Sequence, residues 1–249
     1  MFNEFHYQVR GRAHEQDGSH GQDRTAYLYR HGVQVLCLAD GSGASPCSEQ
    51  GAQAVVDEGC KLLAERFGAL ITSTVAEQSR RDILERLHAR LAGVARNVGC
   101  TLDDLASTFL AVAVSDERFV AVHIGDGVIG YVKHGELRVI SAPDNDEFAN
   151  ETTFVTSANA AESMRLYRGS LDGVSGFVQM SDGTSASLYD YRNKALATAC
   201  TKLIEVVSAA PTRQTKNPKH ARHLQRLIDT KLRAATKDDC SIGILGRRV

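Results

Sequence analysis

Four short apolar runs separated by brief turns constrain the fold of this chain more than any other feature. The runs cover residues 108–115, 119–124, 128–133 and 137–141, and turn-forming residues such as Gly125-Asp126-Gly127 lie between them. A parallel crossover needs a dozen or more residues, so runs this close together must pair antiparallel. The sequence therefore predicts an antiparallel sheet in this segment.

Apolar periodicity assigns most of the remaining chain. Helical spacing covers 48–67, 76–98, 193–209 and 218–235, and strand-like runs cover 5–12, 25–31, 33–39, 176–181 and 241–245. Residues 142–170 hold polar turns and one or two strands that the pattern does not place. The order is strands, two helices, strands, two helices, strand, which predicts an α+β fold of two packed antiparallel sheets with helices outside. We expect residues 1–249 to form a single domain.

Charge and composition exclude several classes of protein. The chain has 29 basic and 30 acidic residues, so it has no overall field that would attract nucleic acid or an anionic membrane. It has no 18-residue apolar span, and its first residues lack the order of a signal peptide. Six cysteines without CxxC spacing indicate buried thiols in a reducing cytoplasm and argue against a zinc site. The basic run 212–223 is interpreted as a solvated loop and helix face, with contact to a partner as the alternative.

Isolated aspartates stand at the ends of apolar strands. Asp40, Asp126 and Asp182 each follow such a strand next to a glycine, and Asp239 directly precedes the last strand. Each one alone is typical of a turn or a helix cap. Together they place several carboxylates at the rim of a core without nearby cationic partners in sequence, where desolvation is costly. A shared Mg²⁺ or Mn²⁺ would resolve this conflict, because these ions bind carboxylates, backbone carbonyls and water.

Six short motifs in the same order resemble those of the PP2C (PPM) family of metal-dependent protein phosphatases. They are Gln22-Asp23, Ala39-Asp40-Gly41-Ser42-Gly43, Ala106-Ser107-Thr108, His123-Ile124-Gly125-Asp126-Gly127, Met180-Ser181-Asp182-Gly183 and Asp238-Asp239-Cys240. The resemblance runs through nearly the whole chain and is closest to a short bacterial branch of the family.

The resemblance implies a four-layer αββα sandwich with two Mn²⁺ or Mg²⁺ ions at one end. Asp40 would bridge the two ions, and the carbonyl of Gly41 would bind one of them. Asp182 and Asp239 would complete the site, and Asp23 would act through bound water. Asp126 would help hold a weaker third ion. A metal-activated water would then attack a phosphomonoester in line.

Three departures from the family pattern concern the second metal, the leaving group and the substrate phosphate. Gln22 replaces an acidic residue and Ser42 a histidine, and Gly18 stands where a phosphate-binding arginine is expected. Arg12 or His14 would have to substitute for that arginine. The segment between Asp126 and Asp182 is short, so we expect the family's flap to be reduced or absent.

The leading hypothesis is a cytoplasmic phosphatase that hydrolyses phosphoserine and phosphothreonine in bacterial signalling. Its expected partners are phosphoprotein substrates and a cognate Ser/Thr kinase, and the expected state is a monomer. The alternative is a catalytically impaired PP2C-like module that binds a kinase or phosphoprotein. A two-metal nuclease or small-molecule phosphoesterase is a third possibility, but the sequence shows no basic nucleic-acid track.

Overall fold

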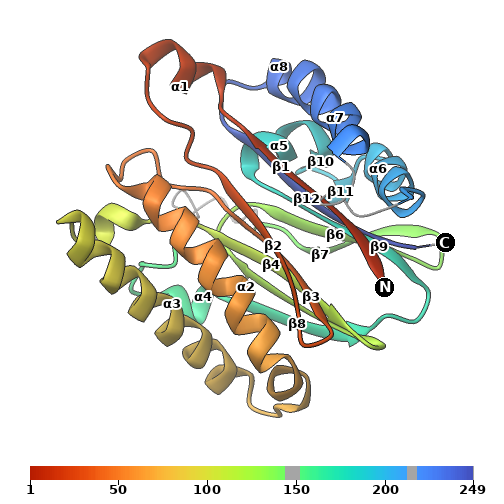
Figure 1. Cartoon of the computed structure of the whole chain (residues 1–249), viewed down its shortest axis with the longest axis horizontal. Helices are drawn as coiled ribbons and strands as arrows, with labels where there is room; N and C mark the ends of the chain where they lie inside the picture. The colour runs from red at the N-terminus through yellow and green to blue at the C-terminus, as the bar shows by residue number, and fades with distance from the viewer. Residues whose placement is uncertain (144–151, 212–217, 249) are drawn as a thin grey trace.

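Two five-stranded antiparallel sheets form the centre of the computed structural model, which describes residues 1–143, 152–211 and 218–248 (Figure 1). The first sheet has the order β2-β3-β4-β5-β8. Its strands are β2 (Arg24–Arg30), β3 (Val33–Ala39), β4 (Phe109–Ser115), β5 (Arg118–Ile124) and β8 (Arg165–Ser170). All neighbouring strands pair antiparallel, as the short turns predicted.

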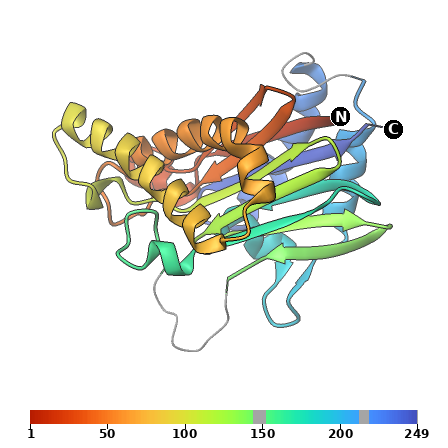
Figure 2. The same ribbon diagram turned by 90° about the horizontal axis from the view of Figure 1, so that it is seen from below.

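The second sheet has the order β1-β12-β9-β6-β7 and joins both ends of the chain. Its strands are β1 (Phe2–Val9), β12 (Cys240–Arg247), β9 (Val174–Met180), β6 (Val128–Lys133) and β7 (Glu136–Ser141). The first and last strands pair with each other, so the two termini lie close together (Figures 1 and 2). A separate hairpin is formed by β10 (Tyr189–Asp190) and β11 (Ala195–Leu196).

Helices cover the outer face of each sheet, which completes the predicted αββα arrangement (Figures 1 and 2). The first sheet is covered by α2 (Ser48–Thr72), with α3 (Ala76–Val98) packed beside it. The second is covered by α6 (Ala199–Ser208), α7 (Pro218–Leu227) and the π-helical turn η3 (Ile228–Leu232), and η3 leads into α8 (Arg233–Ala235). Short helical segments complete the elements: α1 (Arg12–Asp17), η1 (Asp103–Leu105), α4 (Ala160–Ser163) and α5 (Asp182–Leu188). None of the helices in the described ranges is long and apolar enough to cross a membrane.

Three apolar layers hold the four layers of structure together. In β3, Val35 and Cys37 face α2 while Leu36 and Leu38 face the other sheet, so every residue of this strand is buried. Covering on both faces explains why residues 35–39 of β3 form a continuous apolar run and not an alternating one. On the far side, Ile244 and its neighbours pack against α6 and α7.

Phe177 lies in the apolar layer between the two sheets. Its side chain should contribute much of the packing energy of that layer. Its ring is 1% exposed and lies 5.1 Å from that of Phe119 and 6.1 Å from that of Tyr131, measured between centroids. We expect Phe177→Ala to lower the free energy of unfolding by about 3–5 kcal/mol, because it leaves a cavity in a close-packed layer. Urea unfolding measures this, with the 48% exposed Val98→Ala as a control. A loss below about 1 kcal/mol would contradict the assignment.

The structure differs from the predicted elements at several places. The helix predicted over 48–67 continues to Thr72, and α5 was not predicted. The first strand ends at Val9 and α1 begins at Arg12, because the backbone at Gly11 packs against that of Asp238. A Cβ at Gly11 would lie 2.4 Å from the carbonyl carbon of Asp238. The predicted helix 193–209 begins only at Ala199, because the preceding residues form the β10–β11 hairpin. Part of the proposed flap region (144–151) and of the basic run (212–217) lies outside the described residues.

Candidate active site

The strand ends that carry the predicted aspartates meet at one end of the two sheets. Asp40 directly follows β3, while Asp126 and Asp182 follow β5 and β9, each after one intervening residue. The register places the end of β3 beside the start of β2, and the end of β9 beside the start of β12. Antiparallel pairing therefore brings residues that are far apart in sequence to a common edge.

A hollow of about 210 Å³ lies at this edge. Its lining residues come from the β3–α2 loop, the start of β4, the strand ends and α1: His14, Gln22, Asp40, Gly41, Ser42, Gly43, Thr108, Asp126, Thr152, Phe154, Asp182 and Asp238. The structure thus brings together Asp40, Gly41, Asp126, Asp182 and His14 among the predicted site residues. The hollow is lined mostly by acceptors and by small residues of the backbone turn after Asp40.

The carboxylates at this end repel one another. Burial, followed by the charges of Asp23 and Asp182, raises the pKa of Asp40 well above its ordinary value. Burial and the charge of Asp126 raise the pKa of Asp182. In the described part of the chain, neither Asp40 nor Asp182 forms an ion pair with a lysine or arginine. Ionising both groups is therefore unfavourable unless a cation is added.

Asp23 lies behind the hollow and is only 2% exposed. Its Oδ2 accepts a hydrogen bond of 2.9 Å from the hydroxyl of Ser181, while its Oδ1 has no hydrogen-bond partner. Burial and the nearby charge of Asp239 raise the pKa of Asp23 to about 7. A buried carboxylate oxygen without a donor is costly, so this atom is a candidate to accept a hydrogen bond from a bound water.

The carboxylate of Asp239 does not line the hollow but forms hydrogen bonds with the surrounding loops. Its Oδ1 accepts hydrogen bonds from the Gly11 amide (2.5 Å) and from Nδ1 of His14 (2.9 Å). Its Oδ2 accepts hydrogen bonds from the amides of Gln22 (2.5 Å) and Asp23 (3.3 Å). Together with Asp23 it lines a second cavity, of about 400 Å³. The carboxylate of Asp239 therefore ties the α1 and β2 loops to β12.

Asp238, the preceding residue, lines the hollow that Asp239 does not reach. Its side chain is exposed, and its charge contributes to the raised pKa of Asp182. The sequence pattern could not separate these two aspartates, because both stand before the same strand. Only the direction in which the chain enters β12 distinguishes them.

The two predicted substrate contacts lie in different places. His14 is half-buried at the hollow, where burial alone would lower its pKa, but the hydrogen bond and charge of Asp239 raise it overall. Arg12 is exposed on α1 and donates from Nε to the carbonyl of Thr236 at 2.9 Å. It does not line the hollow, because α1 turns its side chain toward the end of α8.

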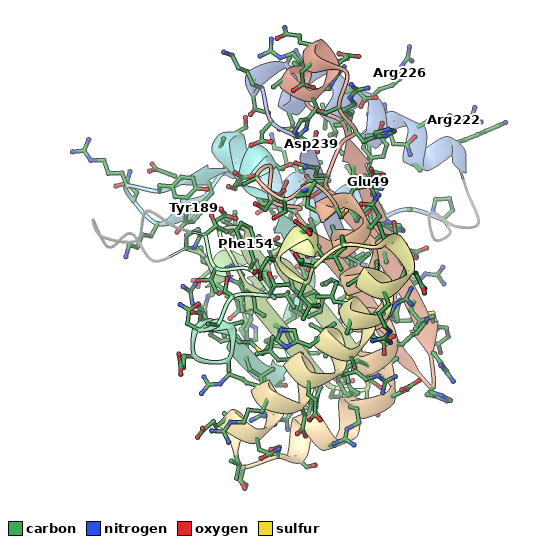
Figure 3. All side chains as sticks on the ribbon, turned by 90° about the vertical axis from the view of Figure 1, so that its left-hand side faces the viewer. Glu49, Phe154, Tyr189, Arg222, Arg226 and Asp239 are labelled. Carbon is green, nitrogen blue, oxygen red and sulfur yellow. The ribbon has the colours of Figure 1, made fainter. Side chains whose placement is uncertain are left out.

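Two residues that sequence analysis did not select also line the hollow. The hydroxyl of Thr152 donates a hydrogen bond of 2.5 Å to Oδ2 of Asp126. Phe154 lies beside it (Figure 3), on a segment anchored by Val155, whose amide donates to the Ser107 carbonyl at 2.8 Å. In sequence, Thr152 belongs to a segment, 149–153, that resembles the short bacterial branch of the family, but this resemblance assigns it no role. The hydrogen bonds of Thr152 with Asp126 and of Val155 with Ser107 place this part of the chain at the site.

The donor set fits a hard divalent cation. Carboxylates and a backbone carbonyl are the ligands such ions prefer, and a Cβ at Gly41 would lie 2.9 Å from the backbone oxygen of Ser48, so only glycine suits this turn. Within the described ranges, no group of three or more His, Cys, Asp or Glu side chains is gathered closely enough to enclose an ion.

Comparison with known proteins places the chain in a family. A family model described as protein phosphatase 2C matches residues 10–229. The chain belongs to the protein phosphatase 2C family. It is accordingly a protein-serine/threonine phosphatase, a hydrolase of phosphoric monoesters, and membership does not favour the alternative of an impaired binding module. A search of curated proteins gave no matching sequence.

Solved structures of other phosphatases share the PP2C fold. A bacterial serine phosphatase has a TM-score of 0.65 at 18% identity, covering 99% of this chain and 98% of that one. Stp1 from Staphylococcus aureus has a TM-score of 0.64 at 17% identity, covering 100% and 96%. The catalytic domain of PstP, solved in complex with two manganese ions, has a TM-score of 0.63 at 18% identity, covering 98% and 97%. At these identities the likeness shows the fold alone.

Proposed function

We propose that this PP2C-family chain dephosphorylates phosphoserine and phosphothreonine with two divalent cations, Mn²⁺ or Mg²⁺, held at the hollow. The observation that carries the proposal is the set of repelling carboxylates around Asp40. Among the residues that the structure describes, neither Asp40 nor Asp182 pairs with a lysine or arginine. The two manganese ions of the PstP structure support the same number and type of ion. A weaker third ion near Asp126 and Asp182 belongs to the proposal as well.

Asp40, Gly41 and Asp182 would hold the ions, with Asp238 taking the ligand position predicted for Asp239. This reassignment is supported by the hydrogen bonds that both oxygens of Asp239 already accept and by the position of Asp238 at the hollow. Divalent cations bound there would lower the pKa of water and neutralise the charge on the transferring phosphoryl group. Asp23 would accept a hydrogen bond from water through its unpartnered Oδ1.

The other lining residues would position the substrate. His14 lies at the hollow with a raised pKa, so a larger share of it is cationic at a given pH, which suits an anionic phosphate. Gln22 and Ser42 supply neutral hydrogen-bonding groups where the family pattern has charged or imidazole side chains. We propose His14 and not Arg12 as the phosphate contact, because Arg12 lies on the outer side of α1.

The wider setting of the enzyme belongs to this proposal too. We take residues 1–249 as one domain with a reduced flap, acting as a monomer in the cytoplasm on phosphoproteins modified by a cognate Ser/Thr kinase. The hollow of about 210 Å³ is small, which favours a phosphorylated side chain over a bulky small-molecule phosphoester.

Phosphate release from a phosphothreonine peptide and from p-nitrophenyl phosphate, with and without Mn²⁺, tests the function. We expect release that requires Mn²⁺ and disappears with EDTA. A folded protein that binds Mn²⁺ yet hydrolyses neither compound would contradict the proposal. It would favour the alternative of a catalytically impaired binding module.

Asp238 and Asp239 form a matched pair for testing the ligand assignment. We expect Asp238→Asn to lower Mn²⁺ affinity at least about tenfold with little change in the stability of the metal-free protein, because its carboxylate is exposed. Asp239→Asn should instead destabilise the metal-free protein by about 1–3 kcal/mol, since an amide cannot accept all the hydrogen bonds that the two oxygens of Asp239 now accept.

Isothermal titration with Mn²⁺ and urea unfolding in EDTA measure the two effects. If Asp239→Asn abolishes Mn²⁺ binding while Asp238→Asn leaves it intact, the original assignment of Asp239 holds.

A further inference from the structure

A row of exposed cations leads from the hollow along the C-terminal helices. Residues 218–237 carry six lysines and arginines and one acidic residue, Asp229, whereas the whole chain is nearly neutral. The apolar side of this stretch packs against the second sheet through Leu224, Ile228 and Leu232, which leaves the opposite side to solvent. The sequence alone could not separate this face from an ordinary solvated helix.

Four exposed cations of this stretch, together with the exposed Arg12 of α1, form what we call the basic strip: Arg12, Lys219, Arg222, Arg226 and Lys237. Lys231 is exposed as well but is not counted in the strip. None of the strip residues forms an ion pair with another described residue, whereas Arg233, which points toward α1, pairs with Glu15. In Figure 3, Arg222 and Arg226 point outward from α7, on the flank of the molecule next to Asp239. The strip is thus an unneutralised positive surface, and the single aspartate among these helices, Asp229, already accepts the Tyr7 hydroxyl.

The near end of the strip adjoins the active site. Lys237 directly precedes Asp238, which lines the hollow, and Arg12 contacts the carbonyl of Thr236. From there α8 and α7 run away from α1 (Figure 1). At a rise of 1.5 Å per helical residue, Arg226 and Arg222 lie roughly 20–30 Å from the hollow along this path. An extended peptide covers that distance in roughly six to nine residues.

We propose that the basic strip docks an acidic segment of the phosphoprotein substrate, six to nine residues from the phosphorylated side chain. This inference rests on the proposed function, because it places the phosphorylated residue in the hollow. Charge complementarity identifies the occupant: a chain held at one end by the hollow meets only unpaired cations along the strip. The surface is ionic and exposed, so it selects among substrates through encounter and binding and leaves the chemical step unchanged.

Phosphothreonine peptides that differ only in four glutamates or four glutamines test the proposal. The four positions lie six to nine residues from the phosphothreonine, on its N-terminal side in one pair of peptides and on its C-terminal side in another. For one of the two pairs we expect the glutamate peptide to have a KM about threefold to tenfold lower, with kcat unchanged, because each exposed ion pair contributes little. The preference should fade in 0.5 M salt.

Arg222→Glu/Arg226→Glu should remove the preference and leave hydrolysis of p-nitrophenyl phosphate unchanged. The matched control is Arg90→Glu/Arg96→Glu, which makes the same charge change on exposed positions of α3, on the other side of the molecule. Equal KM values for glutamate and glutamine peptides in both pairs would overturn the proposal. An equal loss of preference in the α3 control would also overturn it. That result would indicate that the net charge of the whole protein, and not the basic strip, attracts the acidic peptide. Absent hydrolysis of p-nitrophenyl phosphate by the wild type would instead overturn the proposed function itself.

Discussion

Asp40→Asn and Asp182→Asn should each lower Mn²⁺-dependent turnover at least about a hundredfold. Loss of a residue that merely supports a metal ligand typically costs 10–100-fold, and these two side chains are proposed as ligands themselves. Both changes keep the shape of the side chain and remove only its charge. Burial and the charge of Asp182 raise the pKa of Asp40, and burial and the charge of Asp126 raise the pKa of Asp182. Removal of either negative charge should therefore weaken the attraction of the whole site for cations.

The control for these variants is Asp116→Asn. Asp116 is exposed in the turn between β4 and β5, at the opposite end of the sheet from the hollow, and its positive φ of 50° is one that asparagine tolerates well. Steady-state kinetics with p-nitrophenyl phosphate at saturating Mn²⁺ compares the three proteins. Near-normal turnover by Asp182→Asn under these conditions would show that the reaction does not require the carboxylate of Asp182.

In EDTA at pH 8, Asp40→Asn should be more stable than the wild type, although it is less active. The pKa of Asp40 is raised in the folded protein, so the stability that this group contributes is full below its unfolded pKa of about 4 and is lost as the pH rises through the folded value. At pH 8 the wild type must either keep a proton there or bury a repelled charge. An amide avoids that cost, which is about 1.4 kcal/mol for every tenfold difference in proton affinity between the folded and unfolded chain.

The same comparison should change with pH and with metal. The advantage of Asp40→Asn should shrink at pH 5.5, because loss of the Asp40 proton on unfolding releases less free energy at the lower pH. His123, whose pKa burial lowers to about 3, changes charge on unfolding in this range, but both proteins contain it and its contribution cancels. At 100 times its Kd, Mn²⁺ should raise the stability of the wild type by about 2.7 kcal/mol, or roughly 5–10 °C in Tm.

Differential scanning fluorimetry in EDTA and in Mn²⁺, at pH 5.5 and 8, measures these shifts. A wild type that is more stable than Asp40→Asn in EDTA at pH 8 would show that the carboxylates do not repel one another as the buried geometry indicates. A Tm of the wild type that Mn²⁺ does not change would contradict the proposed site.

The sequence determined the parts of this protein that depend on short-range pattern. Brief turns forced residues 108–141 into antiparallel strands, and apolar stripes located α2 and α3, because turn length and side-chain periodicity are local properties. The pattern was less reliable where tertiary contacts compete with it, as in the β10–β11 hairpin that displaced the start of the helix at 193–209. The aspartates at strand ends likewise predicted a common acidic site, since antiparallel strands in two stacked sheets bring such ends together.

Only the tertiary structure decided which oxygen atoms face the site. Asp238 and Asp239 are adjacent in sequence, yet one lines the hollow and the other holds the loops at Gly11 and Gln22. Arg12 and His14 are two residues apart on α1, but α1 directs one toward Thr236 and the other toward Asp239. Phe154 lines the hollow, and its neighbour Val155 is held by a backbone hydrogen bond to Ser107, which lies far away in sequence. The direction of a side chain depends on how the backbone packs against distant elements, and no local pattern contains that information.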